Sequence, residues 1–244
     1  MSDRDNPKTY PSLSRTPRHV GFIMDGNGRW AKARDLPRHL GHRAGMENVR
    51  RILRAAVEFG IPIVTLYSFS TENWQRPQSE VSGILDLLRE ALANEIKELD
   101  ANSVQLRHVG DWENLPPDIQ ECFRTATAQT QHNERLIVNI AFNYGGRQEI
   151  IAAVRDIVRE GIPPAAITEE VFAAHLYTAG QPDPDLIIRT SGELRVSNFM
   201  IWQGAYAEYY VTPVLWPDFD RDEFYKALEI FAHRERRYGG IRPA

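Results

Sequence analysis

A carboxylate and an arginine flank two glycines in the segment Asp25-Gly26-Asn27-Gly28-Arg29. Two glycines spaced two apart let backbone N–H groups turn toward an anion. The Asp25 carboxylate can hold Mg²⁺, and the planar Arg29 guanidinium suits phosphate oxygens. The segment is neither a dinucleotide fingerprint, which needs a third glycine, nor a Walker loop, which needs Gly-Lys-Ser/Thr. A tight turn with a solvated arginine is the alternative interpretation.

A second polar segment, residues 189–198, contains two arginines and three hydroxyl groups around Gly192. This composition is typical of an oxyanion cradle, with solvated charge as the alternative. Together, the two separated arginine clusters and the carboxylate of Asp25 indicate a site for two phosphate groups that uses Mg²⁺.

Basic side chains also precede a helical pattern that we expect to begin at Gly45. Arg38, His42 and Arg43 stand there, and cations at a helix N-terminus oppose the helix dipole. A bound anion would offset this cost, which favours an anion site near His42 over a purely structural histidine.

A polar loop follows the second predicted strand, in residues 70–77, with Glu80 just beyond it. Its mixture of cationic, aromatic and amide side chains suits a mobile cover over an anionic ligand. The alternative is a surface loop in which Trp74 packs locally.

The polar segments are spaced by an alternation of apolar runs and amphipathic stretches. Strands are predicted over residues 19–24, 61–69, 104–109, 136–142, 185–189 and 209–214, and helices over 45–59, 81–99, 119–130, 148–159, 169–177 and 222–236. This alternation predicts a single α/β domain over residues 18–244, with about six mostly parallel strands flanked by helices, after a flexible lead-in over 1–17. In such sheets ligands bind beyond the carboxyl ends of the strands, where the polar segments fall.

Composition narrows the possible partners. The net charge of -4 argues against a nucleic-acid binder that works by bulk electrostatics. Cys122 is the only cysteine, so no internal disulfide can form, as fits a reducing compartment. With no apolar leader and no run of about 18 apolar residues, we expect a cytoplasmic protein that meets a lipid from the water side, with peripheral membrane contact. The apolar face over residues 81–99 is then either core or the wall of a lipid tunnel.

Several ordered motifs resemble the cis-prenyltransferase family, and most closely its bacterial undecaprenyl diphosphate synthases. The matching segments are residues 19–30, 70–77, 143–147, 188–199, 215–219 and 234–240. The Asp-Asp-x-x-Asp motifs of the all-helical trans-prenyltransferases are missing from the sequence. The resemblance implies a homodimeric, Mg²⁺-dependent enzyme that adds isopentenyl diphosphate to an allylic diphosphate, with farnesyl diphosphate as the expected starter.

The resemblance also implies roles for individual residues. Asp25 and Glu208 match the metal ligands, and Asp25, Asn73 and His42 are the catalytic candidates. Substrate-binding roles fall on Gly26, Asn27, Gly28, Arg29, Trp30, Arg38, His42, Ser70, Thr71, Glu72, Trp74, Arg76, Glu80, Arg189, Arg195, Val196 and Ser197. Ser68 and Leu136 match residues of the product tunnel.

The resemblance leaves the base that removes the proton and the product length open. Asn73 carries an amide, which is a poor base, so it is expected to orient a phosphate or water; His42, Asp25 and the leaving diphosphate are the alternatives. A small Ser68 and a large Leu136 favour a product near undecaprenyl or decaprenyl length. A short-chain farnesyl-type synthase, a non-catalytic partner subunit, and a phosphatase or nucleotide-binding protein remain as rival interpretations.

Overall fold

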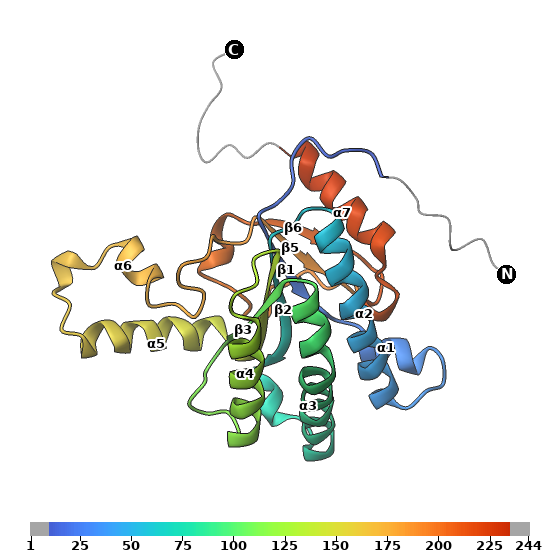
Figure 1. The fold of residues 1–244 in the computed structure, drawn as a ribbon, viewed down its shortest axis with the longest axis horizontal. Coiled ribbons are helices and arrows are strands. Elements are labelled where there is room, and N and C mark those ends of the chain that lie inside the picture. Colours follow the sequence, from blue (N-terminus) through green and yellow to red (C-terminus); the bar gives the residue numbers. More distant parts are fainter. Residues whose placement is uncertain (1–9, 235–244) are drawn as a thin grey trace, which may run out of the picture.

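A computed structural model describes residues 10–234, and its centre is one six-stranded sheet (Figure 1). The strands lie in the order β3-β4-β2-β1-β5-β6, and every neighbouring pair is parallel. The strand bounds are β1 His19–Ile23, β2 Ile63–Ser70, β3 Val104–Val109, β4 Leu136–Tyr144, β5 Leu186–Arg189 and β6 Glu208–Val211. All six predicted strands are confirmed, with ends that shift by up to three residues.

The central strands are buried because helices and loops cover both faces of the sheet. All five residues of β1 are buried, which explains why its sequence reads as a continuous apolar run rather than an alternating one. Val20 stands beside Val64 of β2 and Leu186 of β5. Since all strands are parallel, their carboxyl ends meet at a single edge of the sheet.

Seven α-helices and four short 3₁₀ turns connect the strands of the described chain. The helices are α1 Asn27–Lys32, α2 Arg38–Glu58, α3 Gln78–Ala101, α4 Pro117–Thr130, α5 Gly146–Arg159, α6 Glu169–Ala173 and α7 Arg221–His233. The 3₁₀ turns are Thr71–Gln75, Pro164–Ala166, Gln203–Tyr206 and Trp216–Asp218. The sequence pattern missed α1 and extended α6 to residue 177; the last two residues predicted for α7 lie outside the described range.

The start of α2 corrects a sequence prediction. The helix begins at Arg38, after Pro37, and not at Gly45, so Arg38, His42 and Arg43 lie within it. Its early glycines are not helix breakers, because they let α1 approach. A Cβ added at Gly41 would lie 2.1 Å from the Asn27 carbonyl oxygen.

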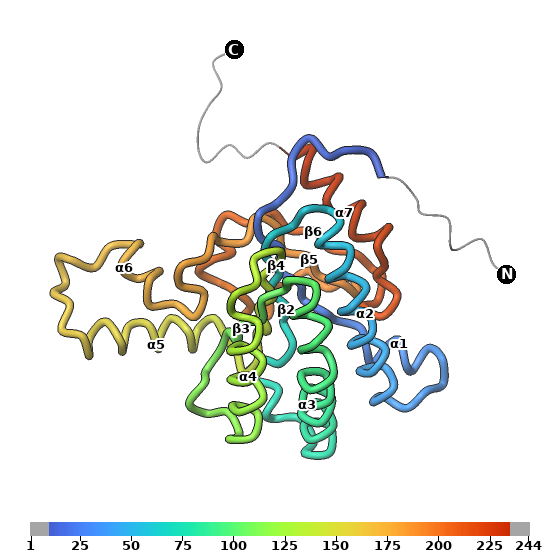
Figure 2. Tube along the Cα trace, in the orientation of Figure 1, coloured from blue at the N-terminus to red at the C-terminus, as the bar shows by residue number. Residues whose placement is uncertain are grey.

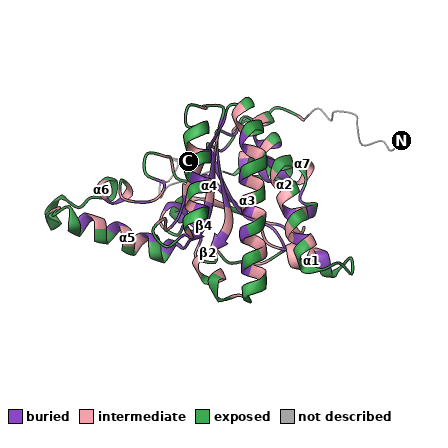
Figure 3. Cartoon of the chain, turned by 60° about the horizontal axis from the view of Figure 1, so that its bottom comes forward, coloured by how far each residue is buried: buried purple, intermediate pink, exposed green. Residues whose placement is uncertain are grey.

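One face of the sheet carries the long helices, and the other is closed mainly by a loop. The helices α2 and α7 share a buried cluster with β1, β2 and β5, whereas α3 and α4 share a second cluster with β3 and β4. On the opposite face, Phe199 packs beside Gly21, where an added Cβ would approach the ring to 3.0 Å. The helices α5 and α6 project sideways (Figures 1 and 3).

Residues 10–17 lie against α7, far away in sequence (Figure 2). The Tyr10 hydroxyl donates to the Asp222 carboxylate, and the Tyr225 hydroxyl donates to the Pro11 carbonyl oxygen at 3.1 Å. The Arg15 guanidinium stacks over the Phe231 ring, 4.3 Å from its centroid. Within the described chain, none of the helices is long and apolar enough to span a bilayer.

A buried polar row crosses the middle of the sheet. His19 Nδ1 donates to the Pro182 carbonyl oxygen at 2.8 Å, and in the neutral ring that burial favours, Nε2 accepts from the Thr65 hydroxyl at 2.7 Å. The Asn139 amide donates to the same Thr65 oxygen. Burial lowers the pKa of His19 to about 4, although the Pro182 hydrogen bond opposes this shift.

We predict that His19 makes the protein less stable in acid. Because its pKa is lower in the folded protein, the unfolded chain binds more protons, and the contribution present above pH 6.5 is lost as the pH falls toward 4. The full difference corresponds to about 3 kcal/mol. The comparison variant is His19→Asn, which keeps a donor to Pro182. Urea unfolding at several pH values should show that the difference in unfolding free energy between the native protein and this variant becomes smaller as the pH falls. Parallel curves for the two proteins would contradict this; His233→Gln is the exposed control.

Candidate active site

A polar cleft of about 1150 Å³ opens at the carboxyl ends of β1, β2 and β5. It gathers most of the candidates from the sequence. Those that line it are Asp25, Gly26, Asn27, Gly28, Arg29, Arg38, His42, Ser68, Ser70, Glu72, Asn73, Arg76, Arg189, Arg195 and Ser197. The segments around residues 25, 38, 70 and 189, which are far apart in sequence, therefore form one site.

The Asp25 carboxylate is held between two arginines. Its Oδ2 atom lies 3.0 Å from Arg189 Nη2 and 3.4 Å from Arg29 Nη2. Burial by itself raises the pKa of Asp25, but the hydrogen bond and charge of Arg189, with the charge of Arg29, outweigh it and leave the pKa below its usual value. The carboxylate is therefore ionised at neutral pH and is available to a cation.

Arg189 organises the segment that follows β5. Its guanidinium donates to the Arg195 carbonyl oxygen at 2.5 Å and to the Ser197 hydroxyl at 2.8 Å, so it curls the loop back over the strand end. Ser197 and Asn198 have positive φ angles of 48° and 63°. Strained backbone of this kind is concentrated at functional sites. The Arg189 Nε atom is buried and has no hydrogen-bond partner within residues 10–234, which leaves one donor of this guanidinium available to a ligand.

The first glycine-containing turn is shaped to bring backbone close to a ligand. Gly26 has a φ of 113°, and an added Cβ would lie 2.9 Å from the Leu215 side chain, so a larger residue is excluded there. The Arg38 Nε lies 3.4 Å from where a Cβ of Gly28 would stand. The Asn27 Oδ1 atom beside them is buried, and no described residue donates a hydrogen bond to it.

Glu80 gathers the cationic groups on the other side of the cleft. Its Oε1 atom lies 3.0 Å from both Arg38 Nη2 and Arg76 Nη1, and 3.7 Å from His42 Nε2. Burial lowers the pKa of His42; Glu80 opposes the shift, and Arg38 and Arg76 add to it. The imidazole is therefore neutral at pH 7, and none of the described residues forms a hydrogen bond with its buried Nε2 atom.

Asn73 lies on the 3₁₀ turn after β2, with its amide oxygen already in use. This oxygen accepts from the Ser70 backbone N–H at 3.1 Å and closes a capping box with Ser70. Asn73 lines the cleft and presents no basic atom, so it can position a ligand oxygen but is poorly suited to remove a proton.

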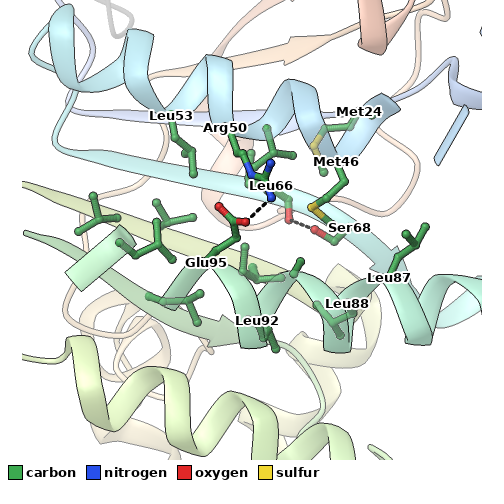
Figure 4. Close-up of a pocket in the computed structure, with 18 of the residues that line it drawn as sticks. Met24, Met46, Arg50, Leu53, Leu66, Ser68, Leu87, Leu88, Leu92 and Glu95 are labelled. Atoms are coloured by element: carbon green, nitrogen blue, oxygen red, sulfur yellow. Dashed lines mark hydrogen bonds and ion pairs between the residues drawn. The ribbon is translucent and has the colours of Figure 1, made fainter. Parts of the chain in front are cut away.

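An apolar cavity of about 570 Å³ continues from the cleft between α2, α3 and the sheet (Figure 4). The two spaces share the lining residues Met24, Asn27, His42, Tyr67, Ser68 and Ile84. Beyond this junction the walls are mainly aliphatic, with Met46, Val49 and Leu53 from α2 facing Leu87, Leu88 and Leu92 from α3. The arrangement suits a ligand with a charged head and a hydrocarbon tail.

Some of the candidates lie outside the cleft. Trp30 Nε1 donates to Asp218 at 2.8 Å, and Trp74 Nε1 donates to Asn143 at 2.7 Å. Both indole N–H groups are therefore bonded to residues that do not line the cleft. Thr71, Val196 and Glu80 are adjacent to the cleft without lining it. Leu136 is fully buried in the core beside Val104, which does line the cavity; Leu136 itself does not.

Glu208 also lies outside the cleft. It begins β6 opposite Leu186, at the amino end of β5, whereas Asp25 contacts the carboxyl end at Arg189. Three residues of strand separate these positions by roughly 10 Å. The Glu208 carboxylate instead accepts from Arg234 at 2.7 Å. Within one chain, the structure does not bring Glu208 to Asp25.

Sequence reasoning missed several residues of the site. Lys32, Asp35 and Tyr67 also line the cleft, and so does Asn198, which the sequence placed in the second polar segment without a role of its own. Asn198 connects three segments: its side chain donates to Glu72 and Gln148 and accepts from the Arg147 backbone N–H. Lys32 lies in the last turn of α1. Because the sequence pattern did not predict α1, it gave no reason to place Lys32 in the cleft.

The cleft suits a divalent metal ion, such as Mg²⁺, that is bound partly by the phosphate groups of a ligand. Mg²⁺ commonly uses one or two carboxylates, with the remaining positions taken by water and substrate phosphate. Asp25 is ionised and partly exposed, as one such ligand would be. Within residues 10–234, the structure contains no group of three or more His, Cys, Asp or Glu side chains that could hold a metal ion. A metal bound at Asp25 would therefore need ligands from water or substrate.

The strand-end cradle with its adjoining apolar cavity defines a class of enzyme that acts on prenyl diphosphates. The family described as "Putative undecaprenyl diphosphate synthase" matches residues 23–239. The isoprenyl transferase of Heliobacterium mobile is 50% identical over 232 residues, covering 93% of this chain and 89% of that protein. That of Agrobacterium fabrum is 49% identical over 237 residues, covering 95% and 96%.

Solved structures agree with these relatives. The lavandulyl diphosphate synthase from Lavandula x intermedia, in complex with dimethylallyl diphosphate, has a TM-score of 0.88 and 36% identity, covering 92% of this chain and 98% of that one. A "probable undecaprenyl diphosphate synthase" from Campylobacter jejuni has a TM-score of 0.78 and 31% identity, covering 92% and 99%. The chain belongs to the undecaprenyl diphosphate synthase family and is a cis-prenyltransferase, of a kind that is generally metal-dependent.

We predict that Glu80→Gln lowers the pKa of His42 further, because the neighbouring carboxylate is what holds it up against burial and two arginines. Two-dimensional NMR titration of the histidines measures this directly. Glu90→Gln on the same helix, whose carboxylate pairs with Arg43 instead, is the matched control and should leave His42 unchanged. An unchanged or higher His42 pKa in Glu80→Gln would show that Glu80 does not set the charge state of this histidine.

Proposed function

We propose that this chain joins isopentenyl diphosphate to an allylic diphosphate in a Mg²⁺-dependent reaction, and that the product grows into the apolar cavity. The observation that carries the proposal is the direct continuity of an arginine-lined cleft with an aliphatic cavity at Ser68 and His42. The substrates differ in their tails and share diphosphate heads, so they need two anion cradles and one hydrocarbon channel.

The turn 25–29, with Arg38, serves the allylic diphosphate. Backbone N–H groups after Gly26 and the two guanidinium groups are placed to stabilise charge that develops as the C–O bond breaks. When bound at Asp25, Mg²⁺ supplies further positive charge to the departing diphosphate. Asp25 remains ionised under the influence of Arg189 and Arg29, so it can hold the cation at neutral pH.

Arg189, Arg195 and Ser197 serve the isopentenyl diphosphate. All three line the same cleft as Asp25, and Arg189 contacts Asp25 itself, so the two diphosphates would lie next to each other. Holding both in this way places the double bond against the allylic carbon. His42 is neutral with an unpartnered Nε2 at the entrance to the cavity, which makes it a candidate to accept the released proton alongside the leaving diphosphate.

The aliphatic cavity favours a long product. It extends from Ser68 along α3 to Asn102, a run of lining residues from Ile84 that spans roughly 27 Å of helix. An undecaprenyl-like product with farnesyl diphosphate as the starter is therefore proposed over a short-chain product. Retention of every arginine of the cleft disfavours a non-catalytic partner subunit.

An exposed apolar stripe on α5 supports the proposal of a homodimer. Ile151, Val154 and Val158 are 51%, 44% and 71% exposed, and their spacing places them on one side of the helix. A second copy of this chain covering the stripe would remove this apolar surface from water. We also propose peripheral contact with a membrane, where a product with a long hydrocarbon tail partitions.

We predict that Asp25→Ala lowers turnover by at least about 10²–10³-fold with the fold intact, because the cradle loses its cation ligand. The purified protein is incubated with Mg²⁺, farnesyl diphosphate and labelled isopentenyl diphosphate, and labelled products are resolved by length. Asp156→Asn, an exposed carboxylate on α5, is the control for a lost charge. Undiminished turnover by Asp25→Ala would remove Asp25 from the metal site.

We predict that Ser68→Leu shortens the products, because this position lies where the cleft meets the cavity. Leu136→Ala should act differently, since its side chain is buried in the core and does not line the cavity. It is expected to cost about 2–5 kcal/mol of unfolding free energy and to change product length less. Product ladders and urea unfolding of both variants distinguish the two; longer products from a fully stable Leu136→Ala would restore Leu136 as a tunnel residue.

A further inference from the structure

The cavity lies along a seam between two helices that belong to different cores. Ile52, Ala55 and Ala56 of α2 pack with β1, β2 and α7. The buried leucines of α3 pack with β3 and α4. Among the described residues, Leu99 and Ile140 are the side chains that contact both clusters. The two helices are therefore anchored mainly in different clusters.

Ion pairs bridge this seam along its length. Arg43 of α2 lies 3.6 Å from Glu90 of α3, and Arg54 lies 2.7 Å from Glu98. Between them, Arg50 pairs with Glu95. The partners advance together along both helices, with spacings of three to seven residues, so each pair occupies a turn that faces the other helix.

The Arg50–Glu95 pair lies across the cavity. Both residues line it, and Figure 4 shows the two charged groups meeting between α2 and α3 in front of Leu66 of the sheet. The Arg50 side chain is 47% exposed and that of Glu95 is 18% exposed, so the pair lies between the cavity and the protein surface. Arg54 and Glu98, which are more exposed, form the next pair along the same wall.

We propose that the Arg50–Glu95 pair closes a sideways exit from the apolar cavity and so helps to set product length. The inference rests on the proposed function, since it needs a hydrocarbon chain in the cavity. While the pair is closed, the growing chain is retained and extended. When it parts, the chain leaves between α2 and α3, so each intermediate is either elongated or released.

The physical chemistry of the seam suits this role. Ion pairs at a protein surface are individually weak and are screened by salt, and the Arg50 end of this pair is exposed, so the pair can part and re-form. The other opening leads back through the cleft, between the arginines that hold the diphosphates. A hydrocarbon that leaves sideways avoids that charged passage.

Charge reversal tests whether the two side chains act as a pair. Arg50→Glu and Glu95→Arg each place like charges across the seam, and each should shift the products toward shorter chains and raise release by about two- to fivefold, the range expected for one exposed pair. The double exchange should restore both length and release. The matched controls are Arg89→Glu and Asp118→Arg, which break a pair between α3 and α4 away from the cavity. Unchanged product lengths in both single variants would overturn the proposal.

Cross-linking tests the exit directly. In a Cys122→Ser background, Arg50→Cys with Glu95→Cys is joined by a short, cleavable bis-maleimide, and the uncleaved and cleaved forms of one preparation are compared. The cross-linked enzyme should make about one chain per active site and then stall until the linker is cleaved. Arg89→Cys with Asp118→Cys should turn over repeatedly when linked. Equal multiple turnover by the linked and cleaved Arg50–Glu95 forms would exclude the exit.

The same assay separates this inference from the proposed function. Absence of any incorporated isopentenyl unit in the native, unlinked protein would refute the prenyl transfer, and the exit with it. Incorporation in every form, with no effect of the linker on release or length, would refute the exit alone.

Discussion

The contact between Asp25 and Arg189 joins the two halves of the site. Asp25 follows β1 and Arg189 ends β5, two parallel neighbours whose carboxyl ends lie at one edge of the sheet. The same guanidinium holds the 189–198 loop through Arg195 and Ser197. One buried arginine thus helps to keep the Asp25 carboxylate ionised and shapes the 189–198 loop, so the two proposed anion cradles share a support.

The second constraint is the separation of charge from hydrocarbon. The cleft concentrates arginines, whereas the adjoining cavity is aliphatic, and Ser68 and His42 lie where they meet. Glu80 holds Arg38 and Arg76 on the cleft side of this boundary while leaving His42 neutral. In the proposed reaction, a diphosphate head and a growing prenyl tail would each lie in surroundings that suit them, with the reacting carbons at the boundary between the two.

Much of this could be predicted from the sequence because it is encoded locally. Continuous apolar runs predicted all six strands, and polar residues directly after parallel strands had to meet at one edge, as Asp25 and Arg189 do. The start of α2 was missed because Gly41 and Gly45 serve a close approach of α1, which is a tertiary requirement. The pairing of Arg50 with Glu95 depends on the relative register of two helices, which the sequence does not give. Glu208 was assigned through the family resemblance, which does not show that β6 begins beside the amino end of β5, away from Asp25.

The most direct test of the account is a crystal structure of the protein with Mg²⁺, isopentenyl diphosphate and a thio-linked farnesyl diphosphate analogue that cannot ionise. The account predicts the analogue's diphosphate at residues 25–29 with Arg38, its tail past Ser68 between α2 and α3, and the isopentenyl head on Arg189, Arg195 and Ser197. A farnesyl tail bound outside the cavity, or two diphosphates that do not share the cleft, would contradict it.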